Sequence, residues 1–179
     1  YYTFFGTIGS IVFGILAAQL VNQKFFGRTF MRSILLFPYV GPVVALAYTW
    51  ELLLDPYSGT LNNLLLNFQV IQEPLNLLGQ KYLTINFFGF DLKLRLALTT
   101  VIIFEIWRYF PLAFLFILAR LQAIPKELYE AADVDGAGPV QKFVSITLPQ
   151  ITAVISILFM IRFIWNFNKF EDIFLLTGG

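Results

Sequence analysis

Four apolar segments, each long enough to cross a lipid bilayer, constrain this chain more than any other feature. They cover roughly residues 2–22, 30–54, 95–121 and 149–169. A helix that crosses the hydrocarbon core takes about 20 apolar residues. The sequence therefore predicts an all-α fold class: a polytopic membrane helix bundle with four transmembrane helices.

The composition agrees with a membrane protein and excludes several functions. Hydrophobic residues make up 58% of the chain and charged residues only 13%, whereas a soluble domain is nearer half apolar and a quarter charged. The net charge of +1 argues against a nucleic-acid partner. Without Cys or His, the chain lacks the usual metal ligands and acid–base catalysts, so we predict no metal site and no catalytic residue. It also lacks the GxxxxGK[ST] loop that would bind ATP.

Small residues and prolines mark two of the predicted spans. The first span carries Gly9 and Gly14 among other small residues near helical spacing, as is typical of close helix contacts in lipid. The second span carries Pro38 and Pro42, which we expect to kink it or to leave carbonyls facing a neighbour or a cavity.

The long link over residues 55–93 is predicted to lie outside the cell. Basic residues are denser, and nearer the span ends, in the links before and after it, which favours a cytoplasmic location for those two links. Asp55-Pro56-Tyr57-Ser58-Gly59 is typical of a turn. Residues 61–68 favour a short helix lying on the membrane or on a partner, and residues 82–92 favour a small hairpin.

A polar segment between the third and fourth apolar runs holds the most specific pattern in the chain. It reads EAADVDGAGPVQKFVSITLP from Glu130 to Pro149, and it must lie in water or against another protein at one membrane face. Pro125 suits the first turn of a helix, and Gly136 and Pro139 end that helix and turn the chain. We therefore expect a short helix, a sharp bend and a return into the membrane at Leu148–Pro149.

The spacing of this segment resembles the EAA loop of importer permeases. Glu130-Ala131-Ala132 is followed by Gly136, Ile146 and Leu148-Pro149 at the intervals of that loop. Such permeases are the membrane subunits of ATP-binding-cassette (ABC) importers that receive substrate from a solute-binding protein. The resemblance implies that residues 123–147 are cytoplasmic and hold a coupling helix that contacts an ATPase subunit. The residues implied in this coupling are Glu130, Ala131, Ala132, Asp135 and Gly136.

A wider similarity points to the maltose-type sugar permeases. Residues 121–130 and 167–179 look like that family, and the similarity begins near Arg28. It implies a multi-pass protein of the bacterial inner membrane that is not itself an enzyme. The implied partners are a second homologous permease, two ATPase subunits, which would bind ATP and Mg, and an extracytoplasmic solute-binding protein; this chain would hold no cofactor. Because the family core has one more span on each side, we expect residues 1–179 to be the interior of one longer permease domain.

Two rows of polar side chains lie within the third and fourth apolar runs. One row is Glu105, Arg108, Tyr109 and Leu112, and the other is Arg162, Trp165, Asn166 and Lys169. Each recurs at i, i+3, i+4 and i+7, which is one stripe of a helix. Ionisable groups at membrane depth are costly, so we expect both rows to face one shared, water-filled cavity. A simpler interpretation stays open, in which Glu105 pairs with Arg108 to hold the bundle and Lys169 reaches the interface.

The maltose-type resemblance assigns these rows to sugar binding at mid-membrane. Aromatic rings for sugar faces, with Asn, Glu and Arg for hydroxyls, suit a carbohydrate. Glu105 and Arg108 are charged where the maltose permease is neutral, and Val43 lacks a hydroxyl, so the sugar can differ. The positions implied are Tyr39, Val43, Glu105, Arg108, Tyr109, Leu112, Trp165, Asn166 and Lys169.

Other functions fit parts of the pattern. A secondary transporter or channel that needs no ATPase could use Glu105 and Arg108 as an ion or proton relay. A membrane scaffold that transports nothing would leave the polar rows unexplained. Among ABC importers, amino acids, phosphate and metals are further substrate classes. The EAA spacing favours the ABC importer, and co-purification of an ATPase subunit distinguishes it from the others.

Overall fold

The computed structural model describes residues 1–179 except 24, 80–82, 88–89, 169–170 and 178–179. The described chain is helical apart from one hairpin, as the predicted fold class requires. Three of its helical stretches are long and apolar enough to cross a membrane, and the number is four if α2 and α3, which are bent by 96° at their junction, count as one span. The elements are α1 (Tyr2–Asn22), α2 (Arg28–Val40), α3 (Val43–Leu54), α4 (Thr60–Asn67), β1 (Leu83–Phe87), β2 (Phe90–Leu94), α5 (Leu96–Gln122), α6 (Lys126–Val134), α7 (Pro139–Lys142), the π-helical stretch η1 (Phe143–Thr147), α8 (Leu148–Asn168) and α9 (Glu171–Thr177).

The chain forms two compact units, which we describe separately. The first contains Thr3–Tyr39 and Ile106–Phe167, and therefore α1, most of α2, the second part of α5, and the helices from α6 to α8. The second contains Val40–Glu105 and Asn168–Gly179, with α3, α4, the hairpin, the first part of α5, and α9.

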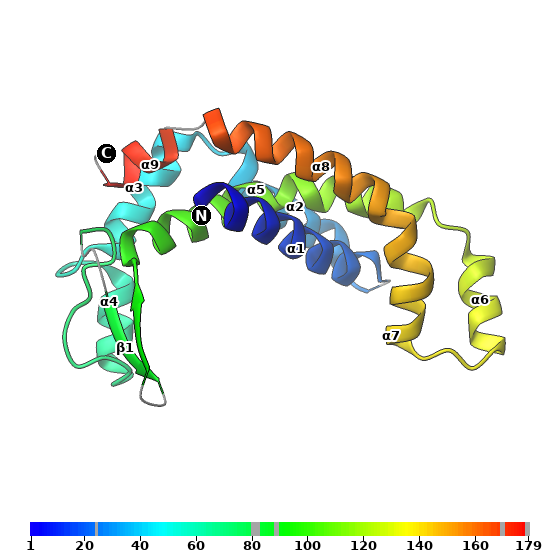
Figure 1. The fold of residues 1–179 in the computed structure, drawn as a ribbon, viewed down its shortest axis with the longest axis horizontal. Coiled ribbons are helices and arrows are strands. Elements are labelled where there is room, and N and C mark those ends of the chain that lie inside the picture. Colours follow the sequence, from blue (N-terminus) through cyan, green and yellow to red (C-terminus); the bar gives the residue numbers. More distant parts are fainter. Residues whose placement is uncertain (24, 80–82, 88–89, 169–170, 178–179) are drawn as a thin grey trace. The chain divides into compact units, whose positions relative to one another are not determined.

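The first unit is built around an apolar core shared by α1, α5 and α8. Ala18, Phe114, Ile117 and Ile151 are fully buried in this core. Partly buried side chains of α2 pack against the same cluster. In Figure 1, α1, α2 and α8 run beside the second part of α5. Van der Waals contacts between these buried side chains hold the helices together, because the backbone hydrogen bonds of each helix lie within that helix.

Two glycines let α1 approach α5 closely, as the small residues of the first span predicted. A Cβ at Gly14 would lie 2.6 Å from the Cβ of Ala113 and 2.9 Å from the backbone nitrogen of Phe114. A Cβ at Gly9 would collide with the side chain of Ile106. At these two points only the absence of a side chain on α1 allows the observed contact.

The second predicted span is not one kinked helix over residues 30–54. It ends as α2 at Val40 and resumes as α3 at Val43. Pro42 has no N–H for a helical hydrogen bond and disfavours helical geometry at the residue before it, Gly41. Pro38, in contrast, lies buried inside α2. The expected kink is therefore a full interruption at the second proline.

The second unit begins with the turn that the sequence predicted after α3. One carboxylate oxygen of Asp55 accepts hydrogen bonds from the Ser58 N–H (2.7 Å), the Ser58 hydroxyl (2.9 Å) and the Tyr57 N–H (3.0 Å). These donors, led by the Ser58 N–H, lower the pKa of the Asp55 carboxyl from its ordinary value of 3.8. The carboxylate of Asp55 is therefore charged, and closes the turn, at pH values above this lowered pKa.

Beyond this turn, the short helix and the hairpin predicted for the long link are both present. Asn62 of α4 is buried and exchanges two hydrogen bonds with the backbone of Leu75. Strands β1 and β2 pair antiparallel, with Leu83 opposite Leu94 and Phe87 opposite Phe90. Asn62 therefore fastens the backbone at Leu75 to α4.

The helix that carries the fourth span begins earlier than predicted. We expected a loop up to residue 147, but α7, η1 and α8 form one continuous helical stretch, Pro139–Asn168. Within it the Leu148 N–H donates to the Phe143 carbonyl, five residues back. Pro149 offers no N–H and its ring crowds the carbonyl four residues before it, so a wider π turn relieves the clash.

Candidate functional site

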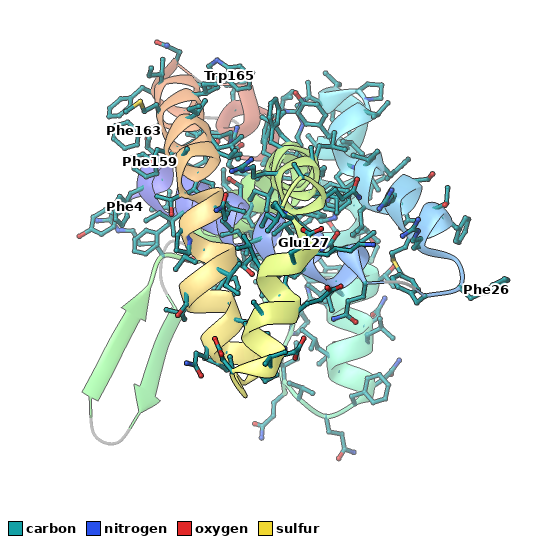
Figure 2. The ribbon with its side chains drawn as sticks, turned by 90° about the vertical axis from the view of Figure 1, so that its right-hand side faces the viewer. Phe4, Phe26, Glu127, Phe159, Phe163 and Trp165 are labelled. Carbon is teal, nitrogen blue, oxygen red and sulfur yellow. The ribbon has the colours of Figure 1, made fainter. Side chains whose placement is uncertain are left out.

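The predicted coupling helix exists as α6 and is a surface element. No residue of α6 is buried. Glu130 and Ala131 are exposed, and Ala132 is half-buried. In Figure 2, α6 faces the viewer and the labelled Glu127 lies on its first turn. The helix therefore offers a carboxylate and two small side chains to a neighbouring protein.

Gly136 ends α6 in the way that the sequence predicted. Its φ of +73° is left-handed, which favours glycine. The Ala137 N–H donates to the Ala132 carbonyl (2.8 Å), and the Gly136 N–H donates to the Asp133 carbonyl (3.1 Å). This pair of bonds is a Schellman motif. The sharp bend after the EAA residues therefore follows from one glycine, with Asp135 as the exposed C-cap.

Three side-chain contacts that the sequence did not reveal lie in or beside the predicted coupling segment. The Tyr129 and Thr147 hydroxyls lie 2.9 Å apart, and Lys142 forms an ion pair with Asp133. Arg120, at the end of α5, donates from Nε to the Gln150 carbonyl (2.9 Å) and from Nη2 to Oε1 of the same residue (2.6 Å). Each contact joins residues many positions apart, which no local pattern encodes.

The predicted sugar-binding tyrosines meet within the first unit. The Tyr39 and Tyr109 rings pack edge to face with centroids 6.1 Å apart. The guanidinium carbon of Arg162 lies 4.0 Å from the centroid of the Tyr109 ring, and that of Arg108 lies 4.9 Å from it. Arg162 is only 1% exposed. The structure thus places Arg162, which the spacing had singled out but the family resemblance had not assigned to the site, beside the predicted sugar-binding tyrosines.

Asn166 and Trp165, neighbours in the predicted row of the fourth span, differ in burial, and the cavity that they were expected to share stays a prediction. Asn166 is 3% exposed and its Nδ2 donates to the Thr7 hydroxyl of α1 at 3.2 Å. Trp165, in contrast, is 44% exposed. Adjacent residues point about 100° apart on a helix, so two neighbours in the predicted row can differ in burial.

The remaining predicted sugar positions are spread over both units. Leu112 is half-buried in the first unit. Val43 is half-buried and Glu105 fully buried in the second unit. On α5, Glu105 stands one turn before Arg108 and Tyr109. Lys169 lies outside the described residues.

The second unit contains an apolar cavity of about 510 Å³. Its chemistry differs from that of the tyrosine cluster, which consists of Tyr39, Tyr109, Arg108 and Arg162. The cavity is lined mainly by leucines with Trp50 and Ile103, and by the threonines Thr60 and Thr100. A sugar needs partners for many hydroxyls, and this lining offers few. Within the described residues, no group of three or more carboxylates lies close enough to hold a metal ion.

A family model matches most of the chain. The family described as "Binding-protein-dependent transport system inner membrane component" matches residues 10–171. That stretch includes the whole coupling segment, the tyrosine cluster and Asn166.

Curated relatives match over nearly the full chain. The inner membrane ABC transporter permease protein YcjO of Escherichia coli (strain K12) is 37% identical over 99% of this chain and 56% of that protein. The trehalose/maltose transport system permease protein MalF of Thermococcus litoralis is 35% identical over 94% of this chain and 52% of that protein. The sn-glycerol-3-phosphate transport system permease protein UgpA of Yersinia pestis is 35% identical over 96% and 53%. The chain thus spans about half the length of these relatives.

The fold is also found in solved structures. A bacterial ABC transporter involved in the import of the acidic polysaccharide alginate superposes with a TM-score of 0.79 at 26% identity, over 98% of this chain and 59% of that chain. The bacterial alginate transporter in complex with an alginate pentasaccharide-bound periplasmic protein superposes with a TM-score of 0.69 at 26% identity, over 90% and 53%.

Proposed function

The chain belongs to the family of inner membrane components of binding-protein-dependent transport systems, and from that membership we propose that it is a transmembrane permease subunit of an ABC importer for carbohydrates. The observation that carries the proposal is the form of the EAA segment: an exposed helix, α6, that a Schellman turn joins to a long helix able to cross the membrane. If another protein binds and moves this surface helix, the movement can pass to the long helix Pro139–Asn168.

The proposed partners follow from this role. A second homologous permease completes the pathway, two ATPase subunits bind ATP and Mg and carry out hydrolysis, and an extracytoplasmic solute-binding protein delivers the substrate. The complex of a related transporter with its periplasmic protein supports the last of these partners. The present chain is not itself an enzyme under this proposal.

The proposed mechanism is alternating access. ATP closes the ATPase dimer, the coupling helix moves with the ATPase surface, and the two permeases rock to expose the substrate site to one side and then the other. Glu130 makes polar contacts in a groove of the ATPase, and Ala131, Ala132 and Gly136 permit a close fit because they add almost no side chain. Asp135 lies at the edge of that contact.

The proposed substrate is a sugar or oligosaccharide. Relatives are named for transport of trehalose and maltose, of sn-glycerol-3-phosphate, and of alginate. The Tyr39 and Tyr109 rings and the Asn166 amide supply the stacking and hydrogen-bonding groups that bind carbohydrates. Because Arg108 and Arg162 contact the same ring, the substrates to test include acidic as well as neutral sugars.

The Glu130→Lys variant of the full-length protein tests the coupling role. We expect normal membrane insertion but loss of ATP-driven uptake, because a lysine replaces the carboxylate that meets the ATPase. The measurement compares ATPase co-purification and sugar uptake in the same vesicles. Glu73→Lys, an equal charge change at an exposed residue of the long link, is the matched control and should leave ATPase assembly unchanged. Normal uptake by Glu130→Lys contradicts the coupling role.

A further inference from the structure

Tyr129 differs from every other residue of α6 in what it contacts. Although α6 buries none of its residues, Tyr129 packs against the apolar core of the first unit together with Ile146 and Leu148. Its hydroxyl lies 2.9 Å from the Thr147 hydroxyl, and Thr147 is only 7% exposed. Tyr129 therefore anchors the coupling helix to the core, from a helix whose other residues are exposed apart from the half-buried Ala132.

Thr147 lies at the junction between the π-helical stretch and the membrane helix α8. It is the last residue of η1, directly before the first residue of α8, and so lies where the π turn passes into the membrane helix. The stretch from Pro139 to Asn168 is continuous helix. A force applied at Thr147 is therefore applied at the base of a helix that can cross the membrane.

The covalent route from α6 to the same helix is more compliant. It runs through Gly136 and Gly138, and a Cβ at either glycine would meet no atom within 4 Å. Glycine has more backbone freedom than any other residue, so no side chain stiffens this turn and it is held mainly by the two Schellman hydrogen bonds. The Asp133–Lys142 ion pair crosses the turn, but the Asp133 side chain is 65% exposed, and exposed ion pairs contribute little and are screened by salt.

We propose that the Tyr129–Thr147 hydrogen bond is the contact that transmits displacement of the coupling helix to α8, with Tyr129 as a positioning residue. This inference rests on the proposed function, since it concerns how the coupling helix of an importer drives its membrane helix. With the bond intact, α6 and the base of α8 move together. Without the bond, the glycine turn absorbs part of the movement before it reaches α8.

The first test measures the anchor itself and needs no transport. Amide hydrogen exchange is followed over Lys126–Val134 in the reconstituted full-length complex. Tyr129→Phe keeps the ring and removes the hydroxyl, and Thr147→Val keeps the shape and removes its partner. Each should speed α6 exchange about two- to tenfold, the range expected for one lost hydrogen bond. Thr147→Ser, which keeps a hydroxyl, should stay near the wild type, as should Asp133→Asn.

The second test measures coupling as the ratio of sugar transported to ATP hydrolysed. Tyr129→Phe and Thr147→Val should each lower this ratio about two- to tenfold, while substrate-independent ATP hydrolysis continues. The double variant should be no worse than either single variant, because both remove the same bond. Thr147→Ser should restore the ratio. A role in stability alone would lower the yield of complex and leave the ratio unchanged.

The two tests separate failure of the inference from failure of the proposed function. Unchanged α6 exchange in Tyr129→Phe overturns the anchor, whatever the complex transports. Faster exchange with an unchanged transport ratio, or additive losses in the double variant, overturns the transmitting role. If the wild-type complex neither hydrolyses ATP nor takes up sugar, the proposed function fails, and the transmitting role that rests on it fails with it, while the exchange data still decide whether the anchor exists.

Discussion

Arg162 shows how a charged residue is accommodated at membrane depth in this protein. It is the largest side chain that the described part of the chain buries almost completely. Its guanidinium lies over the Tyr109 ring at 4.0 Å, and a desolvated contact of this kind stabilises a cation by about 2 kcal/mol. Arg108 uses the face of the same ring. The Tyr109 ring thus contacts two cations that hydrocarbon alone would not tolerate.

Asn166→Ala is expected to reduce sugar uptake while leaving complex assembly and basal ATP hydrolysis near normal. Its Nδ2 bonds to Thr7, whereas its Oδ1 accepts no hydrogen bond from the described residues. If that oxygen serves the substrate, the loss weakens sugar binding by about 1–3 kcal/mol. The measurement is the concentration of sugar that gives half-maximal uptake.

Thr7→Val is the matched control for Asn166, since it removes only the partner hydroxyl and keeps the amide. It should shift the half-maximal sugar concentration less than Asn166→Ala does. Equal shifts in the two variants, or failure of both to assemble, would assign Asn166 to packing between α1 and α8 and remove it from the sugar site.

The sequence could identify which residues of α8 are unusual but not which way each one faces. Spacing singled out Arg162, Trp165 and Asn166, because polar groups in an apolar run stand out. It could not divide them between faces, since a stripe at i, i+3 and i+4 covers a wide arc. The role of Thr7 could not be predicted from the sequence, because Thr7 bonds to a residue 159 positions away. Pairing between distant residues depends on tertiary packing, which local patterns do not encode.

The contact between α1 and α5 depends on glycine at the level of the helix. Gly14 faces Ala113 so closely that any Cβ forces the backbones apart. In lipid, where apolar surface alone gives little preference for another helix over a lipid tail, such close packing drives helix association. Small residues near helical spacing predicted this contact, although they could not identify α5 as its partner.

Gly14→Val is expected to destabilise the protein by about 1–3 kcal/mol, the usual cost of overpacking a close contact. Val12→Ile is its control, because it adds one carbon to an exposed position of the same helix. The measurement is the midpoint of thermal unfolding in detergent. Equal midpoints for Gly14→Val and the wild type would contradict the close packing of α1 on α5.

Prolines explain where the helices depart from the predicted elements. Pro38, Pro42 and Pro149 were all visible in the sequence, and each removes one backbone donor. Their outcomes nevertheless differ: Pro38 lies inside α2, Pro42 ends it, and Pro149 follows a π turn inside a continuous helix. Proline predicts a disturbance, whereas its neighbours decide between a kink, a break and a wider turn. Gly41 before Pro42 makes the break the least costly response.

The proposed function requires α6 and the long link to lie on opposite sides of the membrane. A cysteine at Tyr57, whose side chain is 88% exposed, should react with an impermeant thiol reagent added to intact cells. Tyr57 suits this test better than Ser58, because the Ser58 hydroxyl bonds to Asp55. A cysteine at Glu127 of α6 should react only after lysis. The reverse pattern would invert the predicted topology.

The most direct test of the proposed function is ATP-driven uptake in proteoliposomes. These contain the full-length protein, its partner permease, the ATPase subunits and the binding protein, and they are supplied with neutral and acidic sugars in turn. We predict that at least one sugar accumulates, that accumulation requires ATP hydrolysis, and that ionophores which collapse ion gradients leave it unchanged. Uptake that proceeds without the ATPase subunits and stops when an ionophore is added would instead identify an ion-driven transporter and contradict the proposed function.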